Sequence, residues 1–471
     1  MKLVMKFGGS SLFPASKMKS AAKILQRFSP SNKIVGVASG IGDTTDQLIE
    51  IGDHAKNGEI KQAKKIVSVL QNSHRKLSTA ALGGKIHTEE VMTQIERLNS
   101  ELDRTVEGIA HLRELTPRSR DYLLSFGERL SAPILAAVAN TMGLKARSLT
   151  GSEAGITTDD NFGEAKPLVE VSYHQIRQRL EPLWNQRIVP IVAGFIGATV
   201  DGTITTLGRG GSDYTAALLG AALAADEIWI WTDVDGLMTA DPRIVKDAQA
   251  LRNVSFGEAL ELSYFGAKMM HPRALQPAAE RRTPVRIKNS SRPSLDGTLV
   301  STSESRNGGK IVKAVSLIKD VGIVTVSGTG MMGAPGVAAK VFQTLGSNNV
   351  NVMMISQGSS EAAISCVVAT RELDRAVRAL QLALMGQGYV DRIAEERDAC
   401  VIAVVGAGMK GTPGVAARIF ASVAKRKVNV RMVAQGSSEY NVSFVVSHRD
   451  GPEAVRALHE EFRLGEKVNS R

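Results

Sequence analysis

The stretch LVMKFGGSS, residues 3–11, places an apolar run directly before a pair of glycines. Further apolar runs alternate with amphipathic helical patterns over the first 300 residues: KIVGVAS, KARSLT, RIVPIVAGFIGA, DEIWIWTDV and PVRIKNS. Val- and Ile-rich runs separated by helices are typical of a mainly parallel sheet with helices on both faces. Thr116 and Pro117 predict an N-cap and a first-turn proline before the helical pattern DYLLSFGERLSAPILAAVAN. The sequence therefore predicts an α/β fold for this part of the chain.

The first glycine-rich turn, KFGGSS, could hold phosphate groups. Gly8, Gly9 and Ser10 follow the strand, and residues without a Cβ let phosphate oxygens approach the backbone N–H groups. Lys6 would then supply positive charge to a phosphoryl group in transfer. A tight turn with a solvated lysine is the alternative interpretation of the same residues.

A second glycine-rich turn, TTLGRGGSD at 205–213, leads into the helical pattern TAALLGAALAA. Gly210, Gly211 and Ser212 would present unpaired N–H groups at a helix N-terminus, which favours an anion. Ser212 or Asp213 could instead only cap the helix. Because phosphoryl transfer needs donors around both the leaving and the transferred phosphate, two such turns in one α/β domain favour this chemistry.

A third polar segment, WTDVDG at 231–236, ends an apolar run, and DPR follows at 241–243. Ligand contacts in α/β folds lie at the carboxyl ends of strands, so this segment is a candidate ligand site. An Asx-type turn with its bend at Asp235 and Gly236 is the structural alternative. The stretch FGAK at 265–268 ends an amphipathic helical pattern and says little alone.

An internal repeat occupies the last third of the chain. Residues 328–368 align without a gap on 406–446, with 22 of 41 positions identical. Each copy predicts a βαββα module, in which the first helix begins at Pro335 or Pro413. The remaining expected elements are strands at 321–327 and 400–405, strands around 350–356 and 363–369 in the first copy, and helices at 373–385 and 452–462.

The segment 289–310 is rich in Ser, Gly and Pro and marks a boundary. We therefore predict three domains, 1–305, 306–392 and 393–471.

The composition excludes several classes of protein. The formal charge is +11, but aromatic residues make up only 4% and basic residues are mixed with acidic ones, so nucleic-acid binding is not expected. The longest small and apolar stretch, 216–225, is too short to span a bilayer, so a membrane protein is not expected either. The two cysteines, Cys366 and Cys400, do not have metal-ligand spacing, and we expect no metal site built from protein ligands alone. The N-terminus has no signal-peptide pattern, which together with the few cysteines predicts a cytoplasmic location.

Together, KFGGSS, TTLGRGGSD, WTDVDG, DPR and FGAKMMHP at 265–272 resemble the motifs of the aspartate kinases, and the repeat resembles their tandem ACT domains. The resemblance runs over nearly the whole chain. It implies the amino acid kinase fold followed by two ferredoxin-like ACT domains, and phosphorylation of the β-carboxylate of L-aspartate by ATP with Mg2+. It also implies a homodimer or homotetramer formed through the ACT domains and feedback control by an end-product amino acid in lysine, threonine and methionine synthesis.

The resemblance assigns roles to particular residues. Lys6 and Asp213 match the catalytic positions, where Lys6 would neutralise charge on the phosphoryl group and Asp213 would orient Lys6 or the substrate. A zwitterionic amino acid needs one acid and one base, and Glu128 and Arg209 match the residues that bind the α-ammonium and the α-carboxylate. Thr45, next to Thr44, and Ser39 complete the substrate side. The nucleotide positions are Lys6, Gly8, Gly9, Ser10, Gly210, Gly211, Ser212, Thr232, Asp233, Arg243 and Lys268.

The resemblance to ACT domains implies effector sites between paired modules, at the turn before Pro335 or Pro413 and on the adjoining strands. The candidates are Met332, Gly333, Ala334, Asn351, Gln357 and Ser360 in the first copy, and Gly411, Asn429, Gln435 and Ser438 in the second. Resemblance to threonine-sensitive relatives favours threonine. A lysine effector would need a carboxylate, for which Glu361 and Glu439 are available. The alternative is that the repeats only dimerise.

Two other functions remain open on the sequence. A sister kinase acting on glutamate, acetylglutamate, carbamate or UMP would share the phosphate-binding turns. A catalytically silent amino-acid sensor would be expected to lack Lys6, Glu128 or Asp213, and all three are present.

Overall fold

The structure is a computed structural model and describes residues 1–83, 88–264, 271–303, 310–436 and 439–466. The chain divides into two compact units. The first comprises Met1–Leu237, Arg252–Phe256 and Met269–Ser303, and the second comprises Met238–Leu251, Gly257–Lys268 and Glu304–Arg471. Two short segments from within the first 300 residues thus fold with the C-terminal repeat.

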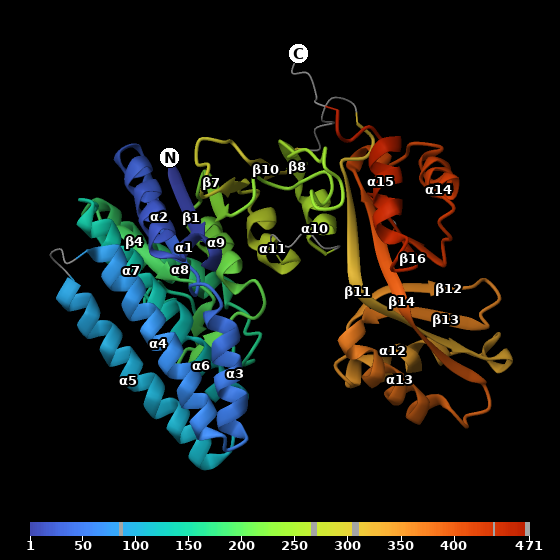
Figure 1. Cartoon of the computed structure of the whole chain (residues 1–471), viewed down its shortest axis with the longest axis horizontal. Coiled ribbons are helices and arrows are strands. Elements are labelled where there is room, and N and C mark those ends of the chain that lie inside the picture. Colours follow the sequence, from blue (N-terminus) through green and yellow to red (C-terminus); the bar gives the residue numbers. More distant parts are fainter. Residues whose placement is uncertain (84–87, 265–270, 304–309, 437–438, 467–471) are drawn as a thin grey trace. The chain divides into compact units, whose positions relative to one another are not determined.

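The first unit is built on a central sheet, and over the described residues it has eight strands in the order β3-β4-β2-β1-β7-β9-β10-β8 (Figure 1). Neighbouring strands from β3 to β9 are parallel, β10 is antiparallel to β9, and β8 is parallel to β10. The bounds are β1 Lys2–Phe7, β2 Lys33–Ala38, β3 Ala146–Leu149, β4 Val189–Ala193, β7 Glu227–Thr232, β8 Asn253–Ser255, β9 Val285–Asn289 and β10 Thr298–Ser301. The predicted α/β class is confirmed.

Helices cover this sheet, and Figure 1 shows α3, α4 and α5 running side by side. Helix α7 is buried along nearly its whole length, which explains its apolar composition. The bounds are α1 Gly9–Leu12, α2 Ala15–Phe28, α3 Thr44–Lys56, α4 Ile60–Leu82, α5 Thr88–Leu112, α6 Pro117–Leu124, α7 Phe126–Thr141, α8 Val169–Asn185, α9 Gly211–Ala222 and α11 Pro272–Glu280, with a hairpin of β5 Ile196–Ala198 and β6 Ile204–Thr206.

The predicted helix start at Thr116 is confirmed. The Ser119 N–H donates to the Thr116 hydroxyl at 3.1 Å, and Pro117 is the first residue of α6. The pattern that follows forms two helices rather than one, because α6 ends at Leu124 and α7 begins at Phe126.

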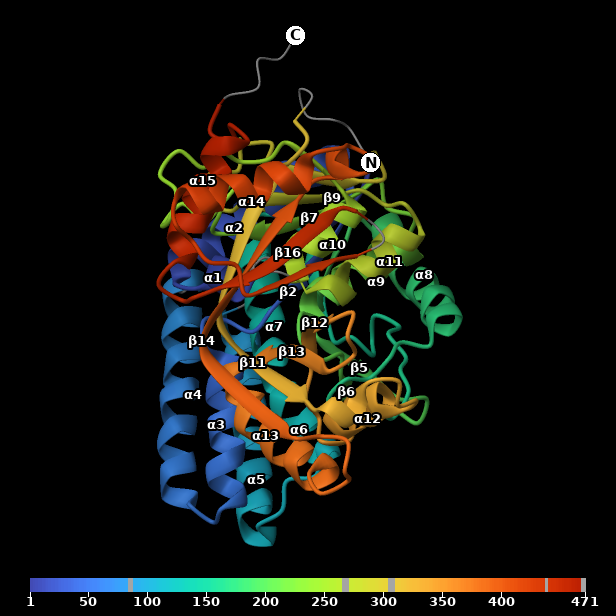
Figure 2. The same ribbon diagram turned by 90° about the vertical axis from the view of Figure 1, so that its right-hand side faces the viewer.

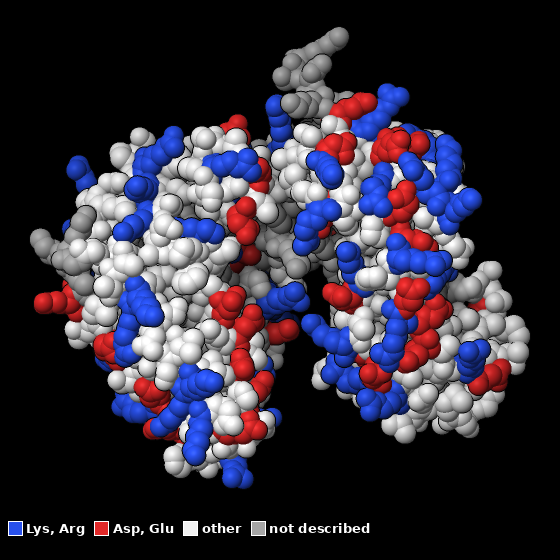
Figure 3. All heavy atoms as spheres, viewed as in Figure 1, with Lys and Arg blue, Asp and Glu red and all other residues white. Residues whose placement is uncertain are grey.

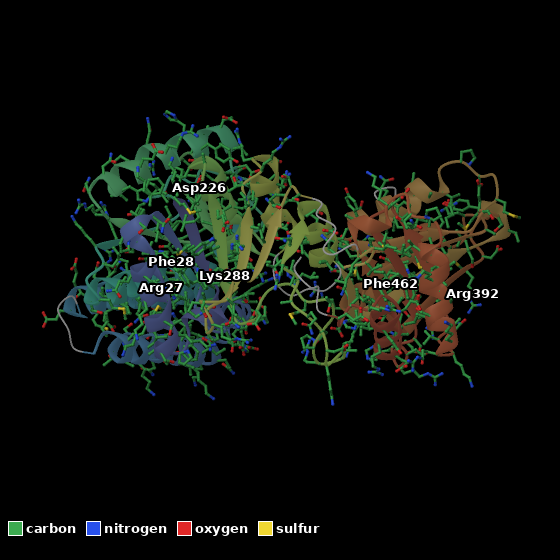
Figure 4. The ribbon with its side chains drawn as sticks, turned by 90° about the horizontal axis from the view of Figure 1, so that it is seen from above. Arg27, Phe28, Asp226, Lys288, Arg392 and Phe462 are labelled. Atoms are coloured by element: carbon green, nitrogen blue, oxygen red, sulfur yellow. The ribbon has the colours of Figure 1, made fainter. Side chains whose placement is uncertain are left out.

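Cations and aromatic rings pack together at the sheet. Figure 4 labels Arg27 and Phe28 at the end of α2 and Lys288 on β9. The Phe28 ring meets Trp229 edge-on at 4.8 Å between centroids, and the Lys288 ammonium lies 5.3 Å from the Trp229 ring. These contacts attach α2 to the strands β7 and β9.

The second unit contains both copies of the repeat. Over the described residues its sheet has six antiparallel strands in the order β12-β13-β11-β14-β16-β15. Helices α12 and α13 pack near one end of the long strands and α14 and α15 near the other, as Figures 1 and 2 show. The bounds are β11 Ala314–Ser327, α12 Val337–Ser347, β12 Val352–Gln357, β13 Ala363–Ala369, α13 Thr370–Leu384, β14 Arg392–Val405, α14 Val415–Lys425, β15 Met432–Gln435, β16 Asn441–Val446, α15 Gly451–Glu461, and α10 Phe256–Tyr264, whose first residue belongs to the first unit.

The two modules share their long strands. Residues 314–318 of β11 pair with 401–405 of β14, and 321–327 of β11 pair with 392–399. Val315 consequently lies in the core formed mainly by the second copy, whereas Val324 lies in the core of the first. The domain limits at 305 and 392 stay a prediction.

The first helix of each module begins later than its proline. Gly336 and Gly414 have φ values of +90° and +83°, a left-handed conformation that precedes helices beginning at Val337 and Val415. Pro335 and Pro413 therefore lie in the turn rather than in the helix.

Charges of both signs are interspersed on the face seen in Figure 3. Among the described residues, no helix is long and apolar enough to cross a membrane.

Candidate active site

A buried ion pair lies at the carboxyl end of the first strand. Lys6 Nζ on β1 is 2.6 Å from Asp213 Oδ1 in the first turn of α9, and the two side chains are only 12% and 9% exposed. β1 lies between β2 and β7, so later strands of the chain add to the sheet on both sides of β1. A crevice at the carboxyl edge of such a sheet is the usual ligand position of open α/β folds.

The KFGGSS turn packs tightly against the turn after β2. A Cβ on Gly9 would lie 2.5 Å from the Gly40 carbonyl oxygen, so only glycine fits there. Gly8 precedes α1, and its N–H donates to the Trp231 carbonyl at 3.3 Å, which joins this turn to the end of β7. Ser10 is exposed in the first turn of α1. The turn is thus fixed to two neighbouring strands.

Glu128 is buried in the first turn of α7 beside these turns. Its Oε1 accepts the Gly40 N–H at 3.0 Å and the Ser212 hydroxyl at 3.4 Å. Its Oε2 is buried and has no hydrogen-bond partner among the described residues. Burial raises the pKa of Glu128 to about 7. An unpaired carboxylate oxygen in this position can accept a cationic group of a ligand.

The structure distinguishes the two adjacent threonines. The Thr44 hydroxyl is buried and donates to the Ile41 carbonyl at 2.6 Å. Thr45 is half-buried, and its Oγ1 would lie 3.5 Å from a Cβ on Gly40. Ser39, whose N–H donates to the Phe7 carbonyl at 3.1 Å, lies beside the first turn. These contacts favour Thr45 as the threonine that faces a ligand.

The TTLGRGGSD turn closes the site from the other side. Gly210 has φ +73° and precedes α9, and a Cβ on it would lie 2.6 Å from the His271 Cβ. Neither Ser212 nor Asp213 caps the helix as the structural alternative required, because the Ser212 hydroxyl donates to Glu128 and Asp213 pairs with Lys6. Gly211 begins α9, and Arg209 is exposed on the turn before it.

Asp121 holds this turn in place and was not singled out from the sequence. Its carboxylate accepts the Thr206 N–H and the Thr206 hydroxyl, both at 2.7 Å, and the Gly163 N–H at 2.9 Å. Burial raises its pKa, which these hydrogen bonds oppose. The sequence shows only a carboxylate in a helical pattern, and periodicity alone does not reveal that the Asp121 side chain is fully buried.

The WTDVDG segment also receives support from a residue that the sequence analysis missed. The Asn289 side chain donates to Asp235 Oδ1 at 2.7 Å, and Ser290 donates its N–H to the Thr232 carbonyl at 2.8 Å. Asn289 ends β9, so the rule that ligand sites gather at strand ends could have found it. Thr232 is half-buried and Asp233 is exposed at the end of β7.

Two predicted nucleotide residues are not among the described residues of the first unit. Arg243 lies in the second unit, where it forms an ion pair at 2.7 Å with Asp241 and is 81% exposed. Lys268 lies outside the described residues.

The predicted effector residues repeat a contact in both modules. The Gly333 N–H donates to the Glu361 carboxylate at 3.0 Å, and the Gly411 N–H donates to the Glu439 carboxylate at 2.6 Å. Apart from the half-buried Ala334, the described candidates are exposed: Met332, Gly333, Asn351, Gln357, Ser360, Gly411, Asn429 and Gln435. Ser438 lies outside the described residues.

The first unit therefore combines the largely buried ammonium of Lys6, two glycine turns, the buried carboxylate of Glu128 with one unpaired oxygen, and the exposed Arg209. Such a group can align a zwitterion and a phosphate-bearing ligand and neutralise charge between them. Within the described residues, no group of three or more His, Cys, Asp or Glu side chains could hold a metal ion.

Known proteins resemble this chain over nearly its whole length. The amino acid kinase family model matches residues 1–289, and an ACT domain model matches 324–384 and 402–462. The chloroplastic aspartokinase 1 of Arabidopsis thaliana is 36% identical over 98% of this chain and 80% of that protein, and aspartokinase 2 of the same plant is 35% identical over 98% and 84%. The crystal structure of E. coli aspartokinase III with aspartate and ADP (R-state) matches with a TM-score of 0.82 at 28% identity, over 98% of this chain and 99% of that one. The same enzyme with lysine and aspartate (T-state) matches with a TM-score of 0.80 at 29% identity, over 98% and 99%.

Proposed function

The chain belongs to the amino acid kinase family and within it to the aspartokinases, and from this membership we propose how its site phosphorylates L-aspartate. An oxygen of the substrate β-carboxylate forms a bond to the γ-phosphorus of ATP while the bond to the β,γ-bridging oxygen breaks, which gives ADP and 4-phospho-L-aspartate. A carboxylate is already nucleophilic, so this step needs alignment and charge neutralisation rather than a covalent intermediate.

The ion pair of Lys6 and Asp213 carries the proposal. Lys6 is largely buried between the two glycine turns that would hold phosphates, so its ammonium acts on the transferring group in a medium of low dielectric. Asp213 orients that ammonium from the first turn of α9.

Aspartate is bound by complementary charges. Glu128 accepts the α-ammonium with its vacant Oε2, and Arg209 receives the α-carboxylate, which an arginine fork can bind through two hydrogen bonds. Thr45 and Ser39 lie beside Gly40 and Phe7 and complete the substrate side.

ATP phosphates are bound by backbone N–H groups of both turns and by the segment after β7. The residues proposed for this are Gly8, Gly9, Ser10, Gly210, Gly211, Ser212, Thr232, Asp233, Arg243 and Lys268. Mg2+ usually reaches kinase sites with the nucleotide phosphates and is held by one or two carboxylates. Asp233, exposed at the end of β7, offers such a carboxylate, and the cation would neutralise phosphate charge there.

The ACT modules regulate the enzyme through an amino acid, for which we favour threonine. The exposed amides of Gln357 and Gln435 suit a hydroxyl group. Lysine is the second candidate, because Glu361 and Glu439 offer carboxylates at equivalent positions and because a similar solved enzyme is described with lysine.

We also propose a homodimer or homotetramer formed through these modules. The proposed domains are a catalytic domain at 1–305 and ACT domains at 306–392 and 393–471, and the proposed location is cytoplasmic.

The test is coupled ADP release with Mg-ATP and L-aspartate, with hydroxylamine trapping the acyl phosphate. Aspartate-dependent hydroxamate is the expected result, and selective inhibition by threonine or lysine identifies the effector. Turnover with glutamate but not aspartate would instead assign a sister activity.

A further inference from the structure

The segment predicted to bind nucleotide, 231–236 in the first unit, is followed directly by a part of the second unit, Met238–Leu251, after which the chain returns to the first unit at Arg252–Phe256. Two of the connections between the units are therefore the step from Leu237 to Met238, directly after the nucleotide segment, and the step from Phe256 to Gly257 within α10. Thr239 is fixed in the second unit, since its carbonyl accepts the Val315 N–H at 2.8 Å. The position of the nucleotide segment therefore depends on how firmly these two connections are held.

A fully buried ion pair holds the second connection. Lys313 Nζ lies 2.7 Å from Glu258 Oε2, and the two side chains are 3% and 0% exposed. The other carboxylate oxygen of Glu258 accepts the Ala407 N–H at 2.7 Å. Glu258 thus joins α10 to the beginning of β11 and to the glycine-rich turn of the second module at once.

Other contacts attach α10 to both modules. The Asn441 side chain donates to Glu261 at 3.1 Å, and a Cβ on Gly257 would lie 2.7 Å from the Tyr440 ring. At the last turn of α10, the side chain of Asn351, one of the predicted effector residues, is near enough to Tyr264 to oppose the rise in the Tyr264 pKa that burial causes. Figure 1 shows α10 beside β11. The helix is therefore a connection between the first 300 residues and both copies of the repeat.

Within the first unit, the start of α10 leads to the nucleotide turn through the sheet. α10 follows β8 without a break, and Ser255 of β8 pairs with Ser301 of β10. At the other end of β10, the Thr298 hydroxyl accepts the Leu237 N–H at 2.9 Å, directly after the WTDVDG segment. A displacement of α10 would reach this segment through two short strands.

We propose that Glu258 is a positioning residue for ATP binding, which acts through its contacts with Lys313 and Ala407 and carries the effect of an amino-acid effector from the ACT modules to the nucleotide side. A buried ion pair seldom contributes stability in excess of a well-packed apolar pair, so the role that we assign to this pair is to fix the position of α10. The inference rests on the proposed assignment of the nucleotide side.

The variant E258M/K313M removes both charges while it keeps the side-chain volume close to native, which avoids an unpaired buried charge. We expect KM for ATP to rise about 5-fold, in the range of measured coupling effects, and KM for aspartate to stay within about 2-fold. The concentration of L-threonine or L-lysine that half-inhibits the enzyme should rise by a similar factor. The matched control is E461Q, which alters an exposed ion pair of Glu461 with Arg418 in the same module and should change neither KM.

A folded E258M/K313M enzyme with native KM for ATP and native inhibition would overturn the proposal. If this variant does not fold, E258Q/K313M decides by the same criteria, because the glutamine can still accept the Ala407 N–H. The variant D233N tests the nucleotide assignment separately, because Asp233 lies in the first unit directly after β7. A native KM for ATP in D233N would mean that the nucleotide assignment has failed, whereas a raised KM in D233N beside a native KM in the Glu258 variants would mean that only the positioning role has failed.

Discussion

Lys6 Nζ and Asp213 Oδ1 lie 2.6 Å apart, although one belongs to the first strand and the other to the helix that follows the second glycine turn. The contact brings the two turns together at one edge of the sheet. Because both side chains are largely buried, their charges interact more strongly than they would in water.

The variant K6A should lose turnover rather than substrate affinity. Without the ammonium, charge on the phosphoryl group is not neutralised in the transition state, so kcat should fall about 10² to 10³-fold while KM for aspartate changes little. Steady-state kinetics by coupled ADP release measures both parameters. A native kcat with a raised KM would remove Lys6 from this role.

Aspartate binding should depend on pH through Glu128. Its pKa is raised to about 7 by burial, and only the carboxylate form pairs with the substrate ammonium. KM for aspartate should therefore rise below pH 7, approaching about tenfold per pH unit. In E128Q the KM should be raised at every pH and lose this dependence. A wild-type KM that is constant between pH 5.5 and 8 would contradict the assignment.

The same residue should make the free enzyme less stable at high pH. The folded pKa of Glu128 lies above its unfolded value, so the folded state holds the proton more tightly, and this advantage is lost as pH rises through about 7. Relative to E128Q, the wild type should lose about 3 kcal/mol of unfolding free energy between pH 4 and 8. Urea denaturation at the two pH values measures the difference, and equal responses in both proteins would refute the prediction.

Gly9 should not tolerate a side chain. A Cβ there would lie 2.5 Å from the Gly40 carbonyl oxygen, so G9A must separate the turns after β1 and β2. We expect kcat/KM for ATP to fall at least about tenfold, as small displacements of reacting groups do. The matched control is G108A in α5, where nothing lies within 4 Å of the added methyl group, and where alanine should stabilise the helix by about 1 kcal/mol. Native activity in G9A would show that the close approach is not required.

Asp121 should stabilise the turn that carries Arg209. In D121N one acceptor oxygen becomes an NH2 group, so a buried donor of Thr206 or Gly163 loses its partner, at a cost of about 2 kcal/mol. KM for aspartate should rise as well. The exposed Asp201, bonded to Thr199, provides the control D201N, for which both quantities should stay near native. Equal stability in the two variants, measured by urea denaturation, would contradict this role.

Local patterns in the sequence predicted most of the fold and suggested many residues of the candidate site. The alternation of strands and helices predicted the parallel sheet, the repeat predicted two modules, and the motifs pointed to Lys6, Glu128 and Asp213. The fold class is confirmed because strand periodicity, glycine turns and helix starts depend on residues close together in the chain, whereas the roles of Lys6, Glu128 and Asp213 stay predictions. The helix starts at Pro335 and Pro413 were placed too early, because the left-handed glycines that follow them depend on how each turn packs.

Contacts between distant segments were decided by the tertiary structure. The sequence gives no sign that Asp121 binds the Thr206 backbone, that Asn289 supports Asp235, or that Glu258 is buried against Lys313. Such pairs follow from the way whole elements pack, and a carboxylate on a helix looks the same in sequence whether it faces water or a buried N–H group. The sequence by itself determined which residue types stand at the strand ends and turns. The unpaired, buried oxygen of Glu128 and the attachment of α10 to the ACT modules were decided by the tertiary structure, because burial and pairing arise only when the elements pack.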